Sequence, residues 1–412
     1  MPEDELAARW AARRARTPVT RDYTYMNCGW VGPLSEPVIA AMRERLELEV
    51  AHGPTTRHVM EDGRERQDGL RRAGARMLGA DPDEIALTGN TTEGVNIALA
   101  GIDLAPGDPV VTTNLEHVGG LIPVYWARHR RGAEVRFVRI AGDDGPGAVV
   151  EAFDRALGHG AKAVVLSEIT YTTGQLLPLS AITELAHARG ATVIVDGAQT
   201  AGHVPIDVHA LGIDAYAVPS HKWLCGPSGL GLLYVRRERI PDVEPSKVSG
   251  RAAASYDYEG AFEPARDRIA KFEVSTLPSL SVAGMLAAVE QYLEAGPDAV
   301  WHRVRELNRR AESVLAPIPG VRVLSPRRDD SRSGHFVFAI DGLDPAGVSG
   351  WMQAEGRVVA RSVRQHGAVR LSLHVYNTDE EIDRVGALVR RLAAGEVGPE
   401  RLATFAPAGP EA

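Results

Sequence analysis

Between Glu84 and Val218 the chain alternates short apolar runs with segments of helical periodicity. Val- and Ile-rich runs of about four to eight residues are typical of strands buried on both faces, and the helical segments suit crossovers between parallel strands. The alternation predicts an α/β fold with a mostly parallel sheet. The strands expected here are 84–88, 110–113, 134–140, 161–168, 192–196 and 214–218.

A second pattern begins after about Lys271. A long helical segment at 280–295 is followed by helices and strands in mixed order up to 393, which indicates a smaller α+β unit. We expect a large domain over 25–280 and a small domain made of 1–24 and 281–395. Residues 396–412 contain three prolines and no periodicity, and are expected to form a frayed tail.

Composition limits the classes of function. A net charge of −8 argues against nucleic acid or an anionic membrane as the main partner. No apolar run approaches the roughly 20 residues of a membrane span, and the N-terminus has no signal-peptide core. The two cysteines form neither a disulfide framework nor a metal-site spacing, which suits a reducing compartment. We therefore expect a soluble, cytoplasmic protein without a metal site.

The segment Ala215–Val235 carries Lys222 between two apolar runs. Lysine is rarely buried at the end of a core strand without a chemical reason, and an amine held neutral there suits Schiff-base chemistry. A surface hairpin whose lysine points into water is an equally good interpretation of this segment alone.

A possible anion site follows the first strand, in the segment 88–96 with the sequence TGNTTEGVN. Free backbone N–H groups at a helix N-terminus, together with the hydroxyls of Thr91 and Thr92, bind anions. Plain helix capping by Asn90 or Thr91 explains the same residues. The segment is not a Walker loop, and the glycines at 226–231 have the wrong spacing for a dinucleotide fingerprint.

Three further side chains are candidates for a ligand site. Asp196 ends an apolar strand, where ligands of open α/β sheets bind, although it also suits a turn cap. His117 follows another strand and offers a ring for stacking, or simply enters a helix. Arg370 interrupts an alternating strand and invites a carboxylate, or else a structural ion pair. Together, an anion cradle, an acid, a ring, a lysine and an arginine fork match what pyridoxal phosphate (PLP) and an amino acid require.

The sequences VDGAQTAGHVPIDVHALGIDAY and SHKWLCGPSGLGLLYV resemble the class V aminotransferase superfamily of fold-type I PLP enzymes. Its members include cysteine desulfurases, C–S lyases and isopenicillin N epimerases, and the likeness runs from about Tyr25 to Leu392. The resemblance implies a mostly parallel sheet of the seven-stranded type in the large domain and a smaller α+β C-terminal domain.

The resemblance also implies a role for each matching residue. Lys222 would be the Schiff-base lysine and the α-proton base, with Asp196 on the pyridine nitrogen and His117 stacked on the ring. Gln199 would bind the phenolic oxygen, and Arg370 the substrate α-carboxylate. The phosphate would be held by Thr91, Thr92, Ser220 and His221, and by Thr276 of the second subunit of a homodimer with shared active sites.

Departures from the family pattern bear on the reaction. Cysteine desulfurases carry a catalytic cysteine shortly before the carboxylate-binding arginine, but the segment 357–369 contains no cysteine. Tyr171 stands where several members have an asparagine, and Cys225 is interpreted as a packing residue. The substrate pocket is expected to be shaped by Asn27, Cys28, Trp30, Tyr171 and Arg361.

We therefore predict a C–S lyase that acts by β-elimination on cystine or an S-substituted cysteine. The alternatives are an isopenicillin N epimerase-like enzyme or an aminotransferase of the same family. An epimerase needs a second base opposite Lys222, for which His366 and Tyr171 are the candidates. A PLP-binding protein without catalysis is the remaining alternative, and the full set of site residues argues against it.

Overall fold

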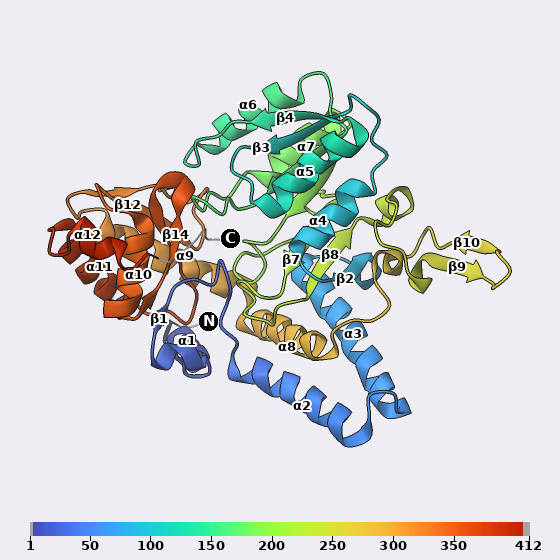
Figure 1. Cartoon of the computed structure of the whole chain (residues 1–412), viewed down its shortest axis with the longest axis horizontal. Coiled ribbons are helices and arrows are strands. Elements are labelled where there is room, and N and C mark those ends of the chain that lie inside the picture. Colours follow the sequence, from blue (N-terminus) through green and yellow to red (C-terminus); the bar gives the residue numbers. More distant parts are fainter. Residues whose placement is uncertain (1–2, 407–412) are drawn as a thin grey trace.

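The computed structural model describes residues 3–406 of the chain. A seven-stranded sheet forms the centre of the larger of its two lobes (Figure 1). Only β8 runs against its neighbours, and the other pairs are parallel. This confirms the predicted α/β class and sheet. Across the sheet the strands are β2 (Ile85–Thr88), β8 (Gly231–Val235), β7 (Ala215–Pro219), β6 (Thr192–Asp196), β5 (Ala163–Ser167), β3 (Pro109–Thr113) and β4 (Glu134–Val138).

Successive side chains of these strands enter different apolar layers, because a strand presents alternate residues to opposite faces. Val193 and Val195 of β6 pack in the same cluster as helices α3, α6, α7 and α8, whereas Ile194 packs with α4 and α5. Helices therefore cover both faces, as a mostly parallel sheet requires. These helices are α3 (Arg57–Leu78), α4 (Thr91–Ala100), α5 (Val118–Arg131), α6 (Pro146–Leu157), α7 (Leu179–Ala188) and α8 (Ser279–Ala295).

A four-stranded antiparallel sheet forms the second lobe. Phe336, Phe338 and Leu371 pack in its core with Trp351. Its strands are β11 (Val321–Val323), β12 (His335–Ile340), β15 (Ala368–Ser372) and β14 (Arg361–Val363), and its helices are α9 (Pro297–Leu315), α10 (Pro345–Gly356) and α11 (Asp379–Ala393). Helix α9 joins the lobes, since Val304 belongs to the core of the large sheet and Leu307 to that of the small one.

The N-terminal segment contacts both lobes. Strand β1 (Thr24–Tyr25) pairs in parallel with β13 (Val358–Val359) of the small lobe. Helix α1 (Glu3–Ala15) places Trp10 in the core of the large sheet, and α2 (Glu36–His52) packs along α8. Trp10 and α8, which the sequence analysis assigned to the small domain, thus pack with the large sheet, and the exact domain boundary stays a prediction.

The chain end differs from the expected tail. Helix α12 (Pro399–Ala403) forms there, and Leu402 is buried in the core of the small lobe. Gly347 of α10 permits this contact, because a Cβ at that position would lie 2.7 Å from the carbonyl oxygen of Leu402. The predicted tail is therefore wrong for 399–403, and residues 407–412 lie outside the described part of the chain.

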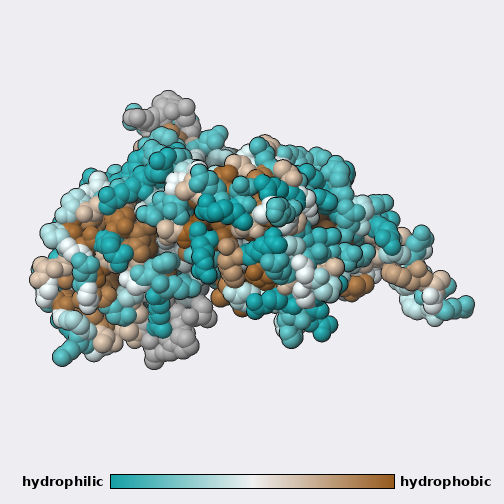
Figure 2. Space-filling model, turned by 90° about the horizontal axis from the view of Figure 1, so that it is seen from above, coloured by the Kyte–Doolittle hydropathy of each residue, from teal (hydrophilic) through white to brown (hydrophobic). Residues whose placement is uncertain are grey.

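A hairpin of β9 (Ala253–Tyr256) and β10 (Phe262–Pro264) projects from the large lobe (Figure 1). Figure 2 shows it again as a separate protrusion at the same end of the molecule. Tyr256, Tyr258 and Phe262 are exposed on it. Short 3₁₀ helices complete the structure: η1 (Pro18–Arg21), η2 (Pro82–Glu84), η3 (Arg237–Asp242), η4 (Gly250–Ala252), η5 (Ile269–Phe272) and η6 (Arg364–His366). No helix within residues 3–406 is long and apolar enough to cross a membrane.

Candidate active site

Lys222 lies in the loop that joins β7 to β8, two antiparallel neighbours inside the large sheet. Residues 223–227 of this loop are buried, so the alternative of a surface hairpin is wrong. Burial lowers the pKa of Lys222 to about 8, nearby Asp196 acts in the opposite direction, and Arg370 and Arg361 lower the pKa further. An amine with this pKa is partly neutral near pH 8, which a nucleophilic or basic lysine requires.

Asp196 is the last residue of β6, which runs parallel to β7. The carboxyl ends of the two strands meet at one edge of the sheet, and this brings Asp196 to the loop of Lys222. The carboxyl is buried, and its Oδ1 accepts a hydrogen bond from the Ala198 N–H at 2.8 Å. Burial raises its pKa, and Lys222 and the Ala198 N–H lower it. A buried carboxylate with so few donors calls for a cationic partner.

The N-terminus of α4 lies against the same edge. A Cβ at Gly231, the first residue of β8, would lie 3.0 Å from Asn90 Cα, so the glycine permits this close approach. Asn90 caps the helix by accepting a hydrogen bond from the Glu93 N–H at 2.9 Å. Capping and an anion site are therefore compatible, because the cap occupies only one of the free N–H groups.

Unpartnered polar atoms gather around this helix terminus. Thr91 Oγ1, Ser220 Oγ and His221 Nδ1 are buried and have no hydrogen-bond partner among the described residues. Ser220 follows Pro219, whose register partner is Gly231, the residue next to Asn90. Buried hydroxyls without partners are costly unless a ligand accepts from them. Thr92, the fourth expected phosphate ligand, is exposed at the same terminus.

His117 is the N-cap of α5, and its Nδ1 accepts a hydrogen bond from the Gly119 N–H at 3.0 Å. Burial and the positive charge of Lys222 lower its pKa to about 4, with further contributions from Arg361 and Arg370. The imidazole is therefore neutral near pH 7, with its proton on Nε2. Its ring meets the edge of Tyr171 at a centroid distance of 5.1 Å, which fixes its plane.

Gln199 belongs to a buried network that the sequence did not reveal. Its Oε1 accepts from Trp223 Nε1 at 2.9 Å and lies 3.1 Å from His335 Nε2, while its Nε2 donates to the Gly29 carbonyl at 2.9 Å. His335 Nδ1 is 3.1 Å from Ser372 Oγ. Three partners thus fix the amide plane of Gln199, and its expected contact with the phenolic oxygen stays a prediction. The polar start of the strand GHFVFAI was the only sequence signal for His335.

Glu116 is a second functional candidate to which the sequence assigned no role. Its oxygens accept from Thr113 Oγ1 at 2.6 Å and from the Ser167 N–H and Oγ at 2.8 and 2.6 Å. A Cβ at Gly120 would lie 3.7 Å from Asp196 Oδ2 and 3.9 Å from Glu116 Oε2, so the two carboxyls are close. Burial raises the pKa of Glu116 to about 7, and Asp196 adds to the rise.

Arg370 enters the site from β15 of the small sheet. It is 1% exposed, and one of its terminal nitrogens, Nη1, donates to the Tyr171 carbonyl at 2.6 Å. Its Nε and Nη2 are buried without a partner among the described residues. Burial lowers the pKa of Arg370 to about 9, and Arg361, its register partner on β14, contributes. A buried guanidinium with two free donors calls for a bidentate anion such as a carboxylate.

The expected pocket residues lie on segments beside Arg370. Asn27 bridges to Ser372 and keeps its Oδ1 unpartnered, and Cys28 Sγ lies 3.3 Å from the Ser372 carbonyl. The guanidinium of Arg361 stacks on the Trp30 ring, 4.2 Å from its centroid. These segments come together because β1 pairs with β13, and no local sequence pattern reports that pairing.

Three other residues that the sequence analysis named have different surroundings. The Tyr171 hydroxyl donates to Gln365 Oε1 at 2.6 Å. The ring of His366 makes no hydrogen bond or ring contact with another described residue. Thr276 is exposed between η5 and α8, and makes no hydrogen bond within the described chain. Its role in a second subunit stays a prediction.

The aminotransferase class-V model matches residues 32–385. The chain belongs to the class-V aminotransferase family. A probable cysteine desulfurase of Methanothermobacter thermautotrophicus is 29% identical, with 92% of this chain and 97% of the relative covered. The isopenicillin N epimerase of Streptomyces clavuligerus is 31% identical, with 76% and 80% covered.

Solved structures of the C–S lyase C-DES share the fold. Its complex with the reaction product cysteine persulfide has a TM-score of 0.84 at 28% identity, covering 95% of this chain and 100% of that one. A mutant of it with glycine covalently linked to PLP has a TM-score of 0.85 at 28% identity, covering 92% and 98%. This class-V protein is PLP-dependent, as the sequence indicated.

The residues of the site fit PLP. Thr91, Ser220 and His221 offer unpartnered polar atoms at a helix N-terminus for a phosphate. Lys222 supplies an amine with a lowered pKa, and Asp196 a buried carboxyl for a protonated ring nitrogen. The neutral, oriented imidazole of His117 suits a position on the face of the ring.

Proposed function

We propose that the protein is a PLP-dependent C–S lyase that acts by β-elimination on cystine or an S-substituted cysteine. The site has the groups that bind an amino acid on this cofactor, and the family contains enzymes whose names describe C–S chemistry. The observation that carries the choice of lyase over desulfurase is the state of the two cysteines.

A desulfurase needs a reactive cysteine thiolate that takes sulfur from the substrate. Cys28 is 0% exposed and Cys225 is 1% exposed. Burial raises the pKa of the Cys28 thiol well above its usual value, and that of Cys225 to about 11. Both sulfurs are therefore protonated near pH 7 and shielded from solvent, and such thiols are inert.

The chain's own residues account for the steps of the reaction. Arg370 holds the substrate α-carboxylate through its two free donors, and Lys222 Nζ removes the proton from Cα. Asp196 keeps its negative charge beside the cofactor nitrogen. When bound, PLP supplies the electron sink for the electrons of the broken Cα–H bond. Lys222 Nζ, which then holds this proton, would return it to the sulfur as the Cβ–S bond breaks, so that sulfur leaves as a thiol or persulfide and the remaining carbon skeleton, after addition of water, ends as pyruvate and ammonia.

The test is the formation of pyruvate from cystine and S-alkyl cysteines by the PLP-loaded protein. We expect one pyruvate for each sulfur compound released, and full activity in a Cys28→Ser, Cys225→Ala double variant, because no protein thiol takes part. If the double variant loses the activity while it keeps its fold and its visible absorbance band, a cysteine is catalytic and the lyase proposal fails.

An amino-acid epimerase is the second candidate, and the position of Tyr171 favours it. The main-chain carbonyl of Tyr171 bonds to Arg370, and its ring contacts His117, so its phenol is adjacent to the expected amino acid. Exchange of the substrate α-proton in heavy water without any pyruvate would support epimerisation. A Tyr171→Phe variant that keeps the exchange but loses inversion would identify the second acid.

We further propose a cytoplasmic homodimer in which Thr276 contacts the cofactor phosphate of the second subunit. The exposure of Thr276 on one chain supports this. Mixing inactive Lys222→Ala with inactive Thr276→Ala subunits tests it, because a mixed dimer has one site in which both residues are intact. Recovered activity is expected, and a monomer in light scattering would exclude the arrangement.

A further inference from the structure

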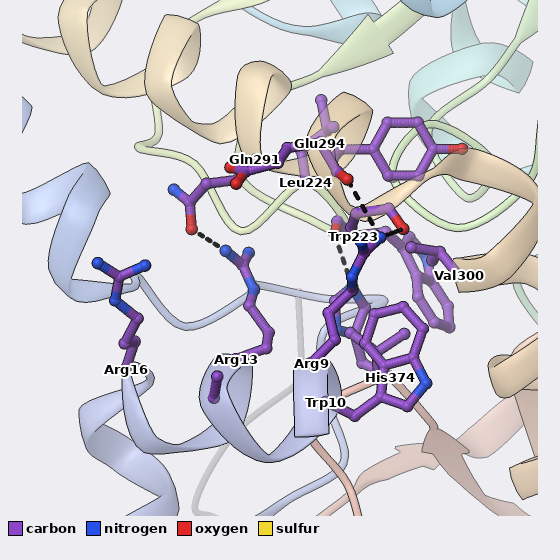
Figure 3. A pocket seen from close by; sticks show the side chains of 15 residues that line it. Arg9, Trp10, Arg13, Arg16, Trp223, Leu224, Gln291, Glu294, Val300 and His374 are labelled. Carbon is purple, nitrogen blue, oxygen red and sulfur yellow. Dashed lines mark hydrogen bonds between the residues drawn. The ribbon is translucent and has the colours of Figure 1, made fainter. Parts of the chain in front are cut away.

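A cavity of about 200 Å³ lies between α1, the C-terminal end of α8 and the loop after Lys222 (Figure 3). Part of its wall is made of apolar or aromatic side chains, among them Trp10, Leu224, Val300 and Val375. It is separated from the catalytic lysine by the buried Trp223, whose indole bonds to Gln199 on the side of the active site. The cavity is thus distinct from the proposed catalytic site.

Three arginines line this cavity: Arg9 and Arg13 of α1, and Arg16 directly after its last residue. Arg9 donates to the carbonyls of Glu294 and Ala295, at 3.2 and 2.8 Å, and Arg13 bonds to the amide oxygen of Gln291. In Figure 3 the Arg16 guanidinium extends beside Arg13 without a bonded partner.

None of these three guanidiniums forms an ion pair with a described carboxylate. Arg14, on the other side of the same helix, is paired with buried Glu381 at 2.8 Å. The chain has more acidic than basic residues, with a net charge of −8, so a lack of acidic residues does not explain why these three arginines are unpaired. Glu294 is the only acidic residue in the cavity lining, and its side chain is unpaired with the arginines. An unneutralised cluster of arginines attracts anions.

A second observation also indicates a ligand. His374 lines the cavity, is 3% exposed, and keeps Nδ1 without a hydrogen-bond partner among the described residues. Its Nε2 donates to the Trp223 carbonyl at 3.0 Å. Burial and the charge of Arg13 lower its pKa to about 3, against the opposing effect of the Trp223 and Gly202 carbonyls, so the ring is neutral. A buried polar atom without a partner requires a ligand or water.

We propose that this cavity binds a small organic anion, namely a carboxylate carried on an aromatic or other apolar body. The carboxylate lies at the arginines, where Arg16 has free donors, and the apolar body lies between Trp10 and Trp223. The volume is below that of a typical drug-sized site, so the ligand has a single ring or a similar size. The proposal does not depend on the reaction catalysed at Lys222.

Calorimetric titration of the PLP-loaded protein with phenylacetate tests the proposal. Saturable binding of one phenylacetate per chain is expected below about 10 mM, accompanied by a change in tryptophan fluorescence. Phenylacetamide, which has the same shape without the charge, is expected to bind about tenfold more weakly or not at all.

Two variants test separately the positive charge at the cavity and the space inside it. Arg13→Gln removes one guanidinium, and Ala12→Leu fills the cavity from an exposed helix position with all charges intact. Each is expected to weaken binding about tenfold. Arg64→Gln is the matched control, because Arg64 is an exposed arginine of α3 that lines no cavity described here. Unchanged melting temperatures would show that the variants fold.

Three results would overturn the proposal. The first is the absence of saturable binding to the wild-type protein, and the second is equal binding of the amide and the acid. The third is binding that survives Arg13→Gln and Ala12→Leu but is lost in Arg370→Lys, which would place phenylacetate at the catalytic arginine. Retained binding in Arg370→Lys together with loss in the two cavity variants supports the proposal.

Discussion

The two sheets contribute opposite halves of the proposed active site, and they differ in how they compensate buried charge. On the large sheet, Lys222 and Asp196 lie close enough for each to stabilise the charge of the other. On the small sheet, Arg370 lies opposite Arg361 in the strand register, and no described carboxylate pairs with Arg370. The charges of the cofactor half are thus partly compensated within the chain, although burial still outweighs this attraction for both groups, whereas the substrate half requires a charge from outside.

Elsewhere in the chain, the charge of a buried side chain is fully compensated by structural ion pairs. Glu273 is 0% exposed, and Arg71 and Arg251 lie 2.7 and 3.0 Å from it. The Leu87 N–H adds a hydrogen bond at 2.9 Å. Arg370 is as buried as Glu273 but lacks such partners. A buried charged side chain without ion-pair partners therefore indicates a binding site rather than a structural ion pair.

The largest expected effect is on the compensated half. Lys222→Ala removes both the cofactor anchor and the proposed base, so turnover should fall about 10³-fold or more. The visible absorbance band of the lysine-bound cofactor should disappear as well. Lys162→Ala is the control, because Lys162 precedes β5 at the opposite edge of the sheet. Unchanged turnover in Lys222→Ala would refute the proposed role.

Asp196→Asn should lower turnover about 10²-fold. The amide keeps the size of the side chain but cannot hold a negative charge beside the ring nitrogen. Steady-state kinetics on the PLP-loaded variant measure the change, and the absorbance band should remain because Lys222 is intact. Wild-type turnover would show that this carboxyl acts only in packing.

Arg370→Met tests the uncompensated half, because its two effects have opposite signs. It should reduce kcat/KM about 100-fold through loss of the carboxylate fork, yet raise the free energy of unfolding of the substrate-free protein by about 1–3 kcal/mol. Arg71→Met should instead lower that free energy by about 3 kcal/mol, since it leaves buried Glu273 short of a partner. Urea unfolding of both variants provides the comparison, and equal destabilisation would make Arg370 a structural residue.

The smallest expected effect concerns the pH dependence of stability. The pKa of Glu116 is raised from 4.5 to about 7, so between these values the folded protein binds more protons than the unfolded chain. Stability from this group is present below pH 4.5 and is lost as the pH rises to about 7. Glu116→Gln should reduce that slope, by no more than about 1.4 kcal/mol per pH unit. An unchanged slope would mean that Glu116 stays ionised.

Much of the large lobe was predictable, because its signals are local. The strands of the sheet are continuous apolar runs, and a chain of such runs and helices has few alternatives to a mostly parallel sheet. Asp196 ends β6 and Lys222 follows the neighbouring strand β7, so their meeting at one edge followed from the fold class. The short helix α12 was not predictable, since a helix of this length is stabilised by packing on α10 rather than by its own sequence.

The substrate side of the site was predictable only as a set of residue types. His335 meets Gln199 through a sequence separation of 136 residues, and Cys28 reaches the Ser372 carbonyl across 344. The sequence left open whether Lys222 was exposed or buried, and whether Arg370 formed an ion pair. Burial of residues 223–227 placed Lys222 in a loop packed inside the protein, and the described part of the small lobe offers Arg370 no carboxylate.

The sequence by itself determined the α/β class, the dependence on PLP and the absence of a cysteine between 357 and 369. These depend on apolar periodicity, on a specific motif and on composition, all of which are local properties of the sequence. Tertiary structure alone decided that Cys28 and Cys225 are shielded thiols, that Arg370 has donors to spare, and that α1 lines a second cavity with arginines. Burial and the partners of a charge depend on residues far apart in sequence, so only the folded chain fixes the protonation and free donors that chemistry uses.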